Sequence, residues 1–295
     1  PVEGPWGGGN NFVKALHEHA SANGFEIIDN LSPGLDVIFM IDPRYDTTGN
    51  SINEIYAYKQ RFPSVKIVYR INECDARKGL IDDIDPIIRS CSRITDLNVF
   101  ISNWIKTHHI EKNDWQGKNN HVIYSGTNKD HFKKSDKIKN GKINIVTHHW
   151  SDNPLKGQDV YEKLDEFCTP DSDYTFTYIG RTKSKFKNAQ LIGPTFGEDL
   201  GRKLSKYDVY VSGTRFDPGP NHIIESISCE IPTYAHKDSG GAVEMVGPKY
   251  TFSNFDELVN MLNNKTFLKE NNVLKVKPWQ ECMKEYFDLI RKELF

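Results

Sequence analysis

The sequence predicts an α/β protein built from two Rossmann-like, doubly wound domains, each a parallel sheet with helices on both faces. Strand-like and helix-like segments alternate in two series, which is the pattern of such sheets. A lysine-rich run, KKSDKIKNGK at 133–142, separates the two series. Apolar segments such as VKIVYRI at 65–71 match the continuous pattern of strands buried on both faces.

Size and composition are consistent with this fold and exclude several functions. A chain of 295 residues can hold two medium domains with real cores. The net charge of -2 provides no global basic field, so we expect no nucleic-acid partner. The five cysteines are scattered and form no C-x-x-C pair, which predicts reduced thiols in a cytoplasmic protein.

Neither a membrane span nor a secretory signal is visible in the sequence. No apolar run approaches the roughly 20 residues that cross a bilayer. No strongly basic amphipathic helix marks a membrane-facing surface, which leaves membrane association open. The chain begins at Pro1 directly on a glycine-rich segment; because such loops normally follow a strand, we expect a first strand upstream.

The first series starts with the glycine-rich segment PWGGGNN, followed by an amphipathic helix over 11–22. Its glycines predict a loop that approaches a phosphate or sugar, and the alternative is a flexible turn. Strands are expected at 25–29, 36–42 and 65–71, and a helix at 51–62 with a capping box from Ser51 and Glu54. Further elements are a helix at 83–91, a strand leading into a helix near Ser102, and a strand from His121.

The second series contains strands at 142–150, 174–181 and 189–194 and helices at 157–167 and 197–205. The stretch 207–241 adds a strand, a polar loop, a short helix and another strand. The lysine-rich run sets the expected boundary, with an N-terminal domain at 1–137 and a C-terminal domain at 138–276. A final amphipathic helix occupies 277–295.

Two carboxylates lie at the loop-to-helix junction of the stretch 207–241. Asp217 is on the loop and Glu225 is about one turn into the helix, so both can face a ligand over the helix N-terminus. Lys156 follows a strand and adds a cation. Lysine and helix N–H groups neutralise a diphosphate, and carboxylates accept hydrogen bonds from hydroxyls. A nucleotide-sugar carries all these groups; the alternative is that both carboxylates only stabilise the helix dipole.

Other sequence motifs for cofactors and metals are absent. The second half has no G-x-G-x-x-G after a strand, and the chain has no P-loop and no G-x-S-x-G. The adjacent pairs His108/His109 and His148/His149 lack the spacing of a metal site. We therefore expect no metal and no required cofactor. The polar run at 72–78 after a buried strand predicts either ligand contacts or a solvated loop.

The stretch DPGPNHIIE resembles the E-x7-E motif of retaining GT-B glycosyltransferases, especially the family-4 type. Further segments stand in the family's order. They are GPWGGGN, VFISNWIK, VIYSGTNKDHF, THHWSDNPLKG, LIGPTFGEDLGRKLSKYDVYVSG and DSGGAVEMV. The resemblance covers nearly the whole chain and implies two Rossmann-like domains that face each other across a cleft. It also implies that the last helix crosses back to the N-terminal domain.

The resemblance implies metal-independent transfer of a hexosyl-type sugar, with retention, from a nucleoside-diphosphate sugar to a glycan or other hydroxyl acceptor. Asp217 would contact the transferred sugar, Glu225 the ribose, and Lys156 the phosphate. The remaining residues are expected to bind the donor or the acceptor. Donor binding would involve Gly8, Gly9, Gly180, Arg181, Gly193 and the amides of Asn221, His222 and Ile223; the acceptor candidates are Arg70, Asn72 and Asp75.

Two departures from the family pattern keep other functions open. Asp217 replaces the family's longer Glu, and the segment HHWSDNPLK has no Arg, so His149, Ser151 or Arg181 would supply the missing donor or charge. The alternatives are a nucleotide-sugar epimerase of the same fold and a catalytically silent sugar-nucleotide or glycan-binding module. A periplasmic-type binding protein requires export, for which the sequence shows no signal.

Overall fold

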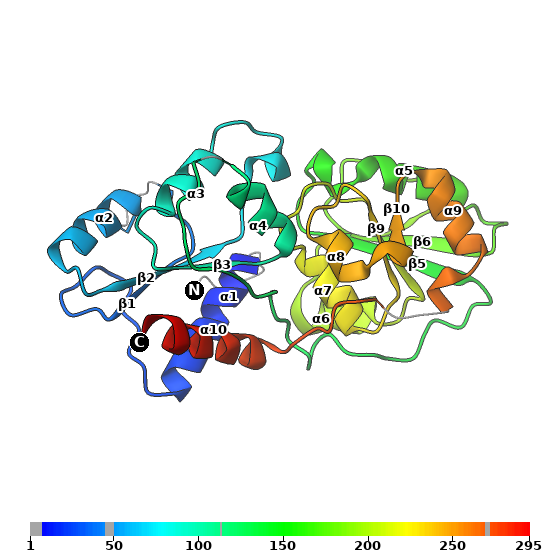
Figure 1. Ribbon diagram of the computed structural model, residues 1–295. Coiled ribbons are helices and arrows are strands. Elements are labelled where there is room, and N and C mark those ends of the chain that lie inside the picture. The colour runs from blue at the N-terminus through cyan, green and yellow to red at the C-terminus, as the bar shows by residue number, and fades with distance from the viewer. Residues whose placement is uncertain (1–7, 45–49, 113, 269–271) are drawn as a thin grey trace. The chain divides into compact units, whose positions relative to one another are not determined.

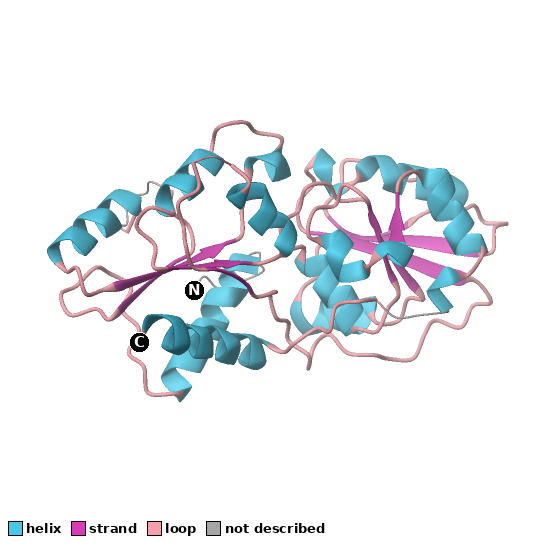
Figure 2. Ribbon diagram, in the orientation of Figure 1, coloured by secondary structure: helices cyan, strands magenta, loops and turns pink. Residues whose placement is uncertain are grey.

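The computed structural model describes residues 8–44, 50–112, 114–268 and 272–295. The chain divides into two compact units, Pro1–Ser125 with Trp279–Phe295, and Gly126–Pro278. Each unit contains a parallel β-sheet with helices on both faces, as the ribbon diagrams show (Figures 1 and 2). The predicted fold class is therefore confirmed.

The first unit is built on a four-stranded parallel sheet in the order β1 (Val37–Met40), β2 (Lys66–Ile71), β3 (Leu97–Phe100) and β4 (Asn120–Val122). Successive side chains of a strand point to opposite faces, and the two faces have separate cores. One core lies under α2 (Ile52–Arg61), α3 (Asp85–Cys91) and α4 (Asn103–Ile110) and contains Ile67 and Tyr69 of β2. The other contains Val68 and is covered by α1 (Gly8–Ala22) and α10 (Trp279–Leu294).

Helix α10 joins the first unit although it is last in sequence. Met283 and Tyr286 of α10 are buried against Phe12 of α1, with the Phe12 and Tyr286 ring centroids 5.2 Å apart. The Arg70 guanidinium of β2 lies 4.3 Å from the Phe12 ring centroid and is itself buried. This aromatic cluster ties the last helix to the first one and to the sheet.

The second unit is built on a six-stranded parallel sheet. In spatial order its strands are β10 (Thr251–Phe252), β9 (Thr233–His236), β8 (Val209–Ser212), β5 (Ile143–His149), β6 (Tyr174–Gly180) and β7 (Gln190–Ile192). The chain runs outward from β5 to β7 and then returns to β8 on the other side of β5. The strand order therefore reverses between β5 and β8. The helices are α5 (Gln158–Phe167), α6 (Gly197–Leu204), α7 (Asn221–Ser228), α8 (Ala242–Val246) and α9 (Phe255–Asn263).

Three local expectations differ from the structure. Residues 25–29 form no strand, and Gly8 and Gly9 lie in the first turn of α1 instead of in a loop; the preceding part of the glycine-rich segment is outside the described residues. The expected capping box does not form, because the Ser51 hydroxyl hydrogen-bonds the Glu54 carboxylate and leaves the helix N–H groups without a side-chain cap. By contrast, Ser102 caps α4 by accepting the Ile105 N–H at 3.2 Å.

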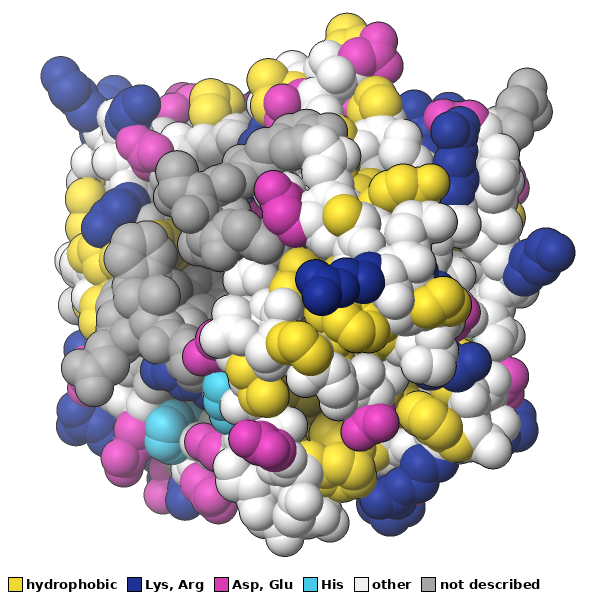
Figure 3. All heavy atoms as spheres, turned by 90° about the vertical axis from the view of Figure 1, so that its left-hand side faces the viewer, with side chains coloured by type: hydrophobic (Ala, Val, Ile, Leu, Met, Phe, Trp, Pro, Cys, Tyr) yellow, Lys and Arg dark blue, Asp and Glu magenta, His cyan; other side chains and the backbone are white. Residues whose placement is uncertain are grey.

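The second unit begins earlier in the chain than the lysine-rich run suggested. Lys137 donates to the carbonyls of Ser205 and Tyr207 at 3.1 and 2.7 Å, and burial lowers its pKa. The Phe132 carbonyl accepts the Ser228 hydroxyl at 2.6 Å. The run is thus partly packed on the second unit, and composition alone could not reveal these contacts. On the face drawn in Figure 3, cationic and anionic side chains are interspersed, as a net charge of -2 leads one to expect.

We predict that Phe12→Ala destabilises the first unit by about 3–5 kcal/mol, because it removes a fully buried ring that α10, α1 and β2 share. Phe25→Ala is the matched control, since Phe25 is 42% exposed. Chemical denaturation of both variants, followed by fluorescence and circular dichroism, measures the loss. Equal losses in the two variants would contradict the proposed role of the aromatic cluster.

Candidate functional site

The candidate site lies in the second unit where the strand order reverses. Open α/β sheets bind ligands outside the carboxyl ends of their strands at such a reversal. His148 and His149 end β5, and the loop after β8 carries Asp217 and leads into α7. Four of the predicted site residues contact or electrostatically influence one another here: Lys156, Asp217, His149 and His222. His148 links Glu225 to this group, because it contacts both Glu225 and His222.

An ion pair joins two predicted residues that are 61 positions apart. The Lys156 Nζ lies 2.7 Å from Asp217 Oδ2, and the two side chains are only 16% and 10% exposed. A pair at this depth is strongly coupled, because loss of either partner leaves an uncompensated charge. The remaining exposure leaves part of the lysine accessible to a ligand.

Backbone contact positions Lys156. Gly157 has φ +94°, and a Cβ built on it would lie 2.2 Å from the carbonyl carbon of Gly213. The Arg215 N–H donates to the Leu155 carbonyl at 2.7 Å. The loop before α5 and the loop after β8 therefore touch without intervening side chains, which brings Lys156 within reach of Asp217.

Glu225 is held by a histidine whose role the sequence did not reveal. His148 Nε2 lies 2.8 Å from Glu225 Oε2, while the Tyr210 hydroxyl lies 3.1 Å from the His148 backbone nitrogen. His222 Nε2 lies 2.9 Å from the Ser212 hydroxyl. These contacts fix α7 against the ends of β5 and β8. The HH pair at a strand end was the only sequence signal for His148.

Burial keeps two histidines of the site neutral. His149 lies 2.6 Å from the Tyr161 hydroxyl through Nε2, and its ring centroid is 4.8 Å from that of His222. Burial, followed by the charges of His222 and Lys156, lowers the pKa of His149 well below its ordinary value. Burial and then Lys156 do the same to His222. His149 therefore brings no positive charge in place of the missing arginine.

The other two candidates to replace the missing arginine, Ser151 and Arg181, lie in different places. The Ser151 hydroxyl accepts the Asn153 N–H at 3.2 Å in the loop that leads to Lys156. The Arg181 guanidinium lies 4.0 Å from the Trp150 ring centroid. Arg215 is a cation that the sequence analysis missed, although it stands two residues before Asp217. Its guanidinium contacts Asp159 at 3.2 Å and the Gly213 carbonyl.

The first turn of α7 faces the same reversal point. The opening N–H groups of a helix have no intrahelical acceptor, and they carry the positive end of the dipole. The Ile223 N–H already donates to the Pro220 carbonyl at 3.1 Å. Of the three amides predicted to bind phosphate, those of Asn221 and His222 therefore remain the better candidates.

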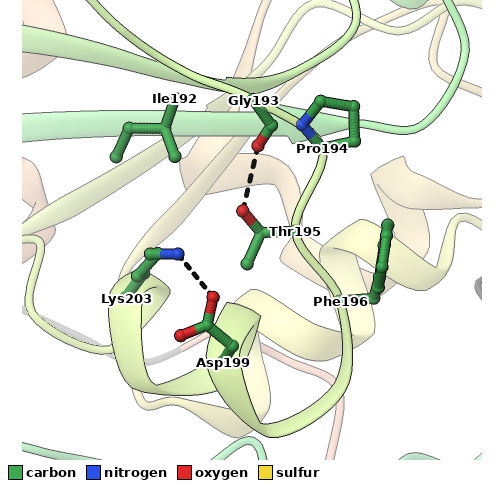
Figure 4. A pocket seen from close by; sticks show the side chains of 7 residues that line it. All are labelled: Ile192, Gly193, Pro194, Thr195, Phe196, Asp199 and Lys203. Atoms are coloured by element: carbon green, nitrogen blue, oxygen red, sulfur yellow. Dashed lines mark hydrogen bonds and ion pairs between the residues drawn. The ribbon is translucent and has the colours of Figure 1, made fainter.

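A pocket follows β7 in the same unit (Figure 4). The Thr195 hydroxyl donates to the Gly193 carbonyl at 2.9 Å, and Lys203 pairs with Asp199 one turn away on the same helix, α6. Phe196 also contacts Trp150, with ring centroids 5.6 Å apart, so the pocket adjoins the stacked Trp150–Arg181 pair. The lining residues are Ile192, Gly193, Pro194, Thr195, Phe196, Asp199 and Lys203.

Gly180 allows two backbone segments to approach each other closely in this region. It has φ +127°, and a Cβ on it would lie 1.9 Å from the His149 carbonyl oxygen. Its N-terminal neighbours in β6 pair with β5, and the Arg181 N–H donates to that same His149 carbonyl at 3.2 Å. Gly180 therefore lets β6 end tightly against β5, which sets the position of Arg181.

The residues predicted to contact the acceptor lie in the first unit, and most of them already form hydrogen bonds within the protein. Arg70 is buried and donates to the Ser125 hydroxyl at 3.0 Å. The Asp75 carboxylate accepts the N–H groups of Ile84 and Asp83 at 2.7 and 3.1 Å. Asn72 is partly exposed, and its amide nitrogen lies 4.0 Å from a Cβ built on Gly9. Asn72 is therefore the most accessible of the three.

Comparison with known proteins bears on the fold. No protein-family model and no curated protein matches the sequence. Sucrose-phosphate synthase from Thermosynechococcus elongatus superposes with a TM-score of 0.66 at 12% identity, over 96% of this chain and 77% of that one. Anabaena HepE, solved in complex with UDP and glucose, gives 0.61 at 16% identity, over 98% and 82%.

The chain has the GT-B fold. TarM adds a third GT-B neighbour, with a TM-score of 0.61 at 12% identity over 97% of this chain and 55% of its own. Identities this low establish the shared fold, and the activity is argued from the site. In the part of the chain that the structure describes, no helix is long and apolar enough to cross a membrane.

We predict that Gly157→Ala destabilises the second unit more than Gly141→Ala does. Both glycines have positive φ, which costs an alanine about 1–2 kcal/mol. Only at Gly157 does the new methyl group overlap another backbone, which adds roughly 1–3 kcal/mol. Urea denaturation of the two variants gives the difference directly, and equal stabilities would show that the loop contact is not tight.

The neutral histidines predict acid lability. The pKa values of His149 and His222 are lower in the folded chain than in the unfolded chain, so the unfolded chain binds these protons first as the pH falls. Their contribution to the free energy of unfolding is therefore complete above pH about 6.5 and decreases as the pH falls below that value. Each such histidine contributes a slope of about 1.4 kcal/mol per pH unit. Unfolding free energies of wild type and His149→Gln between pH 7 and 5 test this, with a shallower slope expected for the variant. Parallel slopes would contradict the assignment.

Proposed function

We propose that this protein is a glycosyltransferase that moves a hexosyl-type sugar from a nucleoside-diphosphate sugar to a hydroxyl of a glycan or similar acceptor, with retention and without a metal. The observation that carries the proposal is the Lys156–Asp217 ion pair at the loop that leads into α7, the helix that carries Glu225. It stands at the strand reversal of a sheet in a GT-B fold. The lysine cation and the helix amides suit the diphosphate of a nucleotide-sugar, and the two carboxylates suit its hydroxyl groups.

The diphosphate would bind Lys156 and the amides of Asn221 and His222. In the free protein Asp217 compensates the lysine charge at 2.7 Å. A diphosphate that takes over this compensation would release Asp217, whose carboxylate can then accept hydrogen bonds from the sugar hydroxyls. This exchange lets the shorter Asp serve where the resembling family has Glu.

The nucleoside would extend from the end of the diphosphate opposite the transferred sugar. Glu225 Oε2 is engaged by His148, which orients the carboxylate so that Oε1 can accept from a ribose hydroxyl. The base would occupy the Gly193 pocket beside Phe196, with Arg181 stacked on Trp150 at its edge. Aromatic and guanidinium faces favour stacking with a planar base.

The chemistry would depend on charge and position. The bond between the anomeric carbon and the donor phosphate breaks, and the acceptor oxygen bonds to that carbon on the same face. The acceptor proton leaves with the departing phosphate, so no side chain forms a covalent intermediate. Lys156 and the α7 amides stabilise the negative charge that develops on the leaving group.

We predict that Lys156→Ala and Asp217→Ala each lower transfer by at least about a hundredfold, because each removes a group that contacts the reacting part of the donor. Lys134→Ala is the control, since Lys134 also forms an ion pair, 2.8 Å from Glu230, but on the surface. A thermal-shift panel of nucleoside diphosphates first identifies the base. Transfer is then followed with the matching nucleotide-sugar and a panel of glycan acceptors.

The products of that assay separate the alternatives. Transfer with retained anomeric configuration by NMR, unaffected by EDTA, supports the whole proposal. An epimerised donor without acceptor would show an epimerase, and donor binding without turnover would show a silent binding module. Full activity of Lys156→Ala would refute the site assignment itself.

A further inference from the structure

The first unit contains a group of three metal-ligating side chains that the proposed transfer reaction does not use. Asp85 is the first residue of α3, and His108 and His109 stand in the last turn of α4. Each offers one ligand atom, and these three atoms all lie within 4.8 Å of one another. Adjacent histidines have no recognised metal spacing, so the sequence alone gave no reason to group them with Asp85.

The Asp85 carboxylate and the His108 ring are already held in place. Asp85 Oδ1 accepts the Asp75 N–H at 2.9 Å, which directs Oδ2 toward His108 Nε2 at 2.6 Å. The His108 ring stacks on Trp104, with centroids 5.5 Å apart and planes at 21°. Positioned carboxylates and imidazoles of this kind are the preferred surroundings of metal ligands.

His109 provides a second observation that points to a metal and does not depend on the distances between the three ligand atoms. It is 0% exposed, and its Nε2 lies 3.2 Å from the Glu73 carbonyl, which can only accept. Nε2 therefore carries the proton, and Nδ1 bears a lone pair. Among the residues that the structure describes, this buried Nδ1 has no hydrogen-bond partner. Burial lowers the pKa of His109 to about 4, so the ring is neutral at neutral pH.

A neutral imidazole that donates its other N–H to a backbone carbonyl is the form that ligates metals. We propose that Asp85, His108 and His109 bind a divalent transition metal ion, of which Zn²⁺ is the best match. Two imidazole nitrogens and one carboxylate oxygen are a ligand set that zinc accepts, with water completing the tetrahedron. The bound ion would fasten α3 to the end of α4.

The required movement is small. Ligands about 2.0–2.2 Å from a tetrahedral zinc lie about 3.3–3.6 Å from one another. The metal would therefore replace the Asp85–His108 hydrogen bond and draw the third ligand inward. Arg89 opposes a cation here, with Nη1 3.9 Å from Asp85 Oδ2, but its Nε donates to Asp114 at 2.8 Å. That partner carboxylate offsets part of the repulsion.

The test uses the metal-stripped full chain, titrated with Co²⁺ and followed by visible absorption, with Zn²⁺ added in competition. We expect one equivalent of Co²⁺, a tetrahedral absorption band without thiolate charge transfer, and displacement by Zn²⁺. His108→Gln should weaken binding more than about tenfold, since it removes a direct ligand. His17→Gln is the matched control, because His17 also faces a carboxylate, Asp29 at 3.9 Å, but belongs to no group of three possible ligands among the residues that the structure describes.

Equal affinities of His108→Gln and His17→Gln would overturn the proposal, as would a thiolate band or no binding by the wild type. Circular dichroism of the metal-free proteins checks that each variant folds. If His108→Gln does not fold, Asp85→Asn provides the second variant, because it keeps a side chain of the same shape and removes the charge. Zn²⁺ should then raise the melting temperature of the wild type and leave that of the variant unchanged.

Discussion

The candidate site depends on the ion pair between Lys156 and Asp217. Each partner comes from a different loop, and the two loops meet only because Gly157 and Gly213 let their backbones touch. The pair is mostly buried, so either charge alone would be costly. A ligand that brings its own anionic and hydroxyl groups can replace each partner's role at once. We therefore propose that the same contact makes the site selective for a ligand with both groups.

The strand order explains why these residues converge. The strand order reverses between β5 and β8, the kind of point at which open α/β sheets bind ligands outside the carboxyl ends of their strands, and α7 follows the loop after β8. His149 and His222 are buried and neutral there, while His148 holds Glu225. Lys156 is thus a cation beside two buried histidines, His149 and His222, whose lowered pKa values keep them neutral.

The fold could be predicted from the sequence, because alternating apolar segments are local signals, and so could the place of Asp217 before α7 and of Glu225 within it. The sequence did not reveal contacts that depend on tertiary structure. Nothing local shows that Lys137 packs under Tyr207, that His148 reaches Glu225, or that Arg215 lies beside the Lys156 loop. The expected strand at 25–29 failed because an apolar run alone does not provide a neighbour to pair with.

The most direct test of the account is a crystal structure of the protein with the nucleoside diphosphate that stabilises it most. We expect a phosphate oxygen within hydrogen-bond distance of the Lys156 Nζ and of the α7 amides, a ribose hydroxyl on Glu225, and Asp217 released from the lysine. A diphosphate bound away from α7, with the Lys156–Asp217 pair intact, would contradict it.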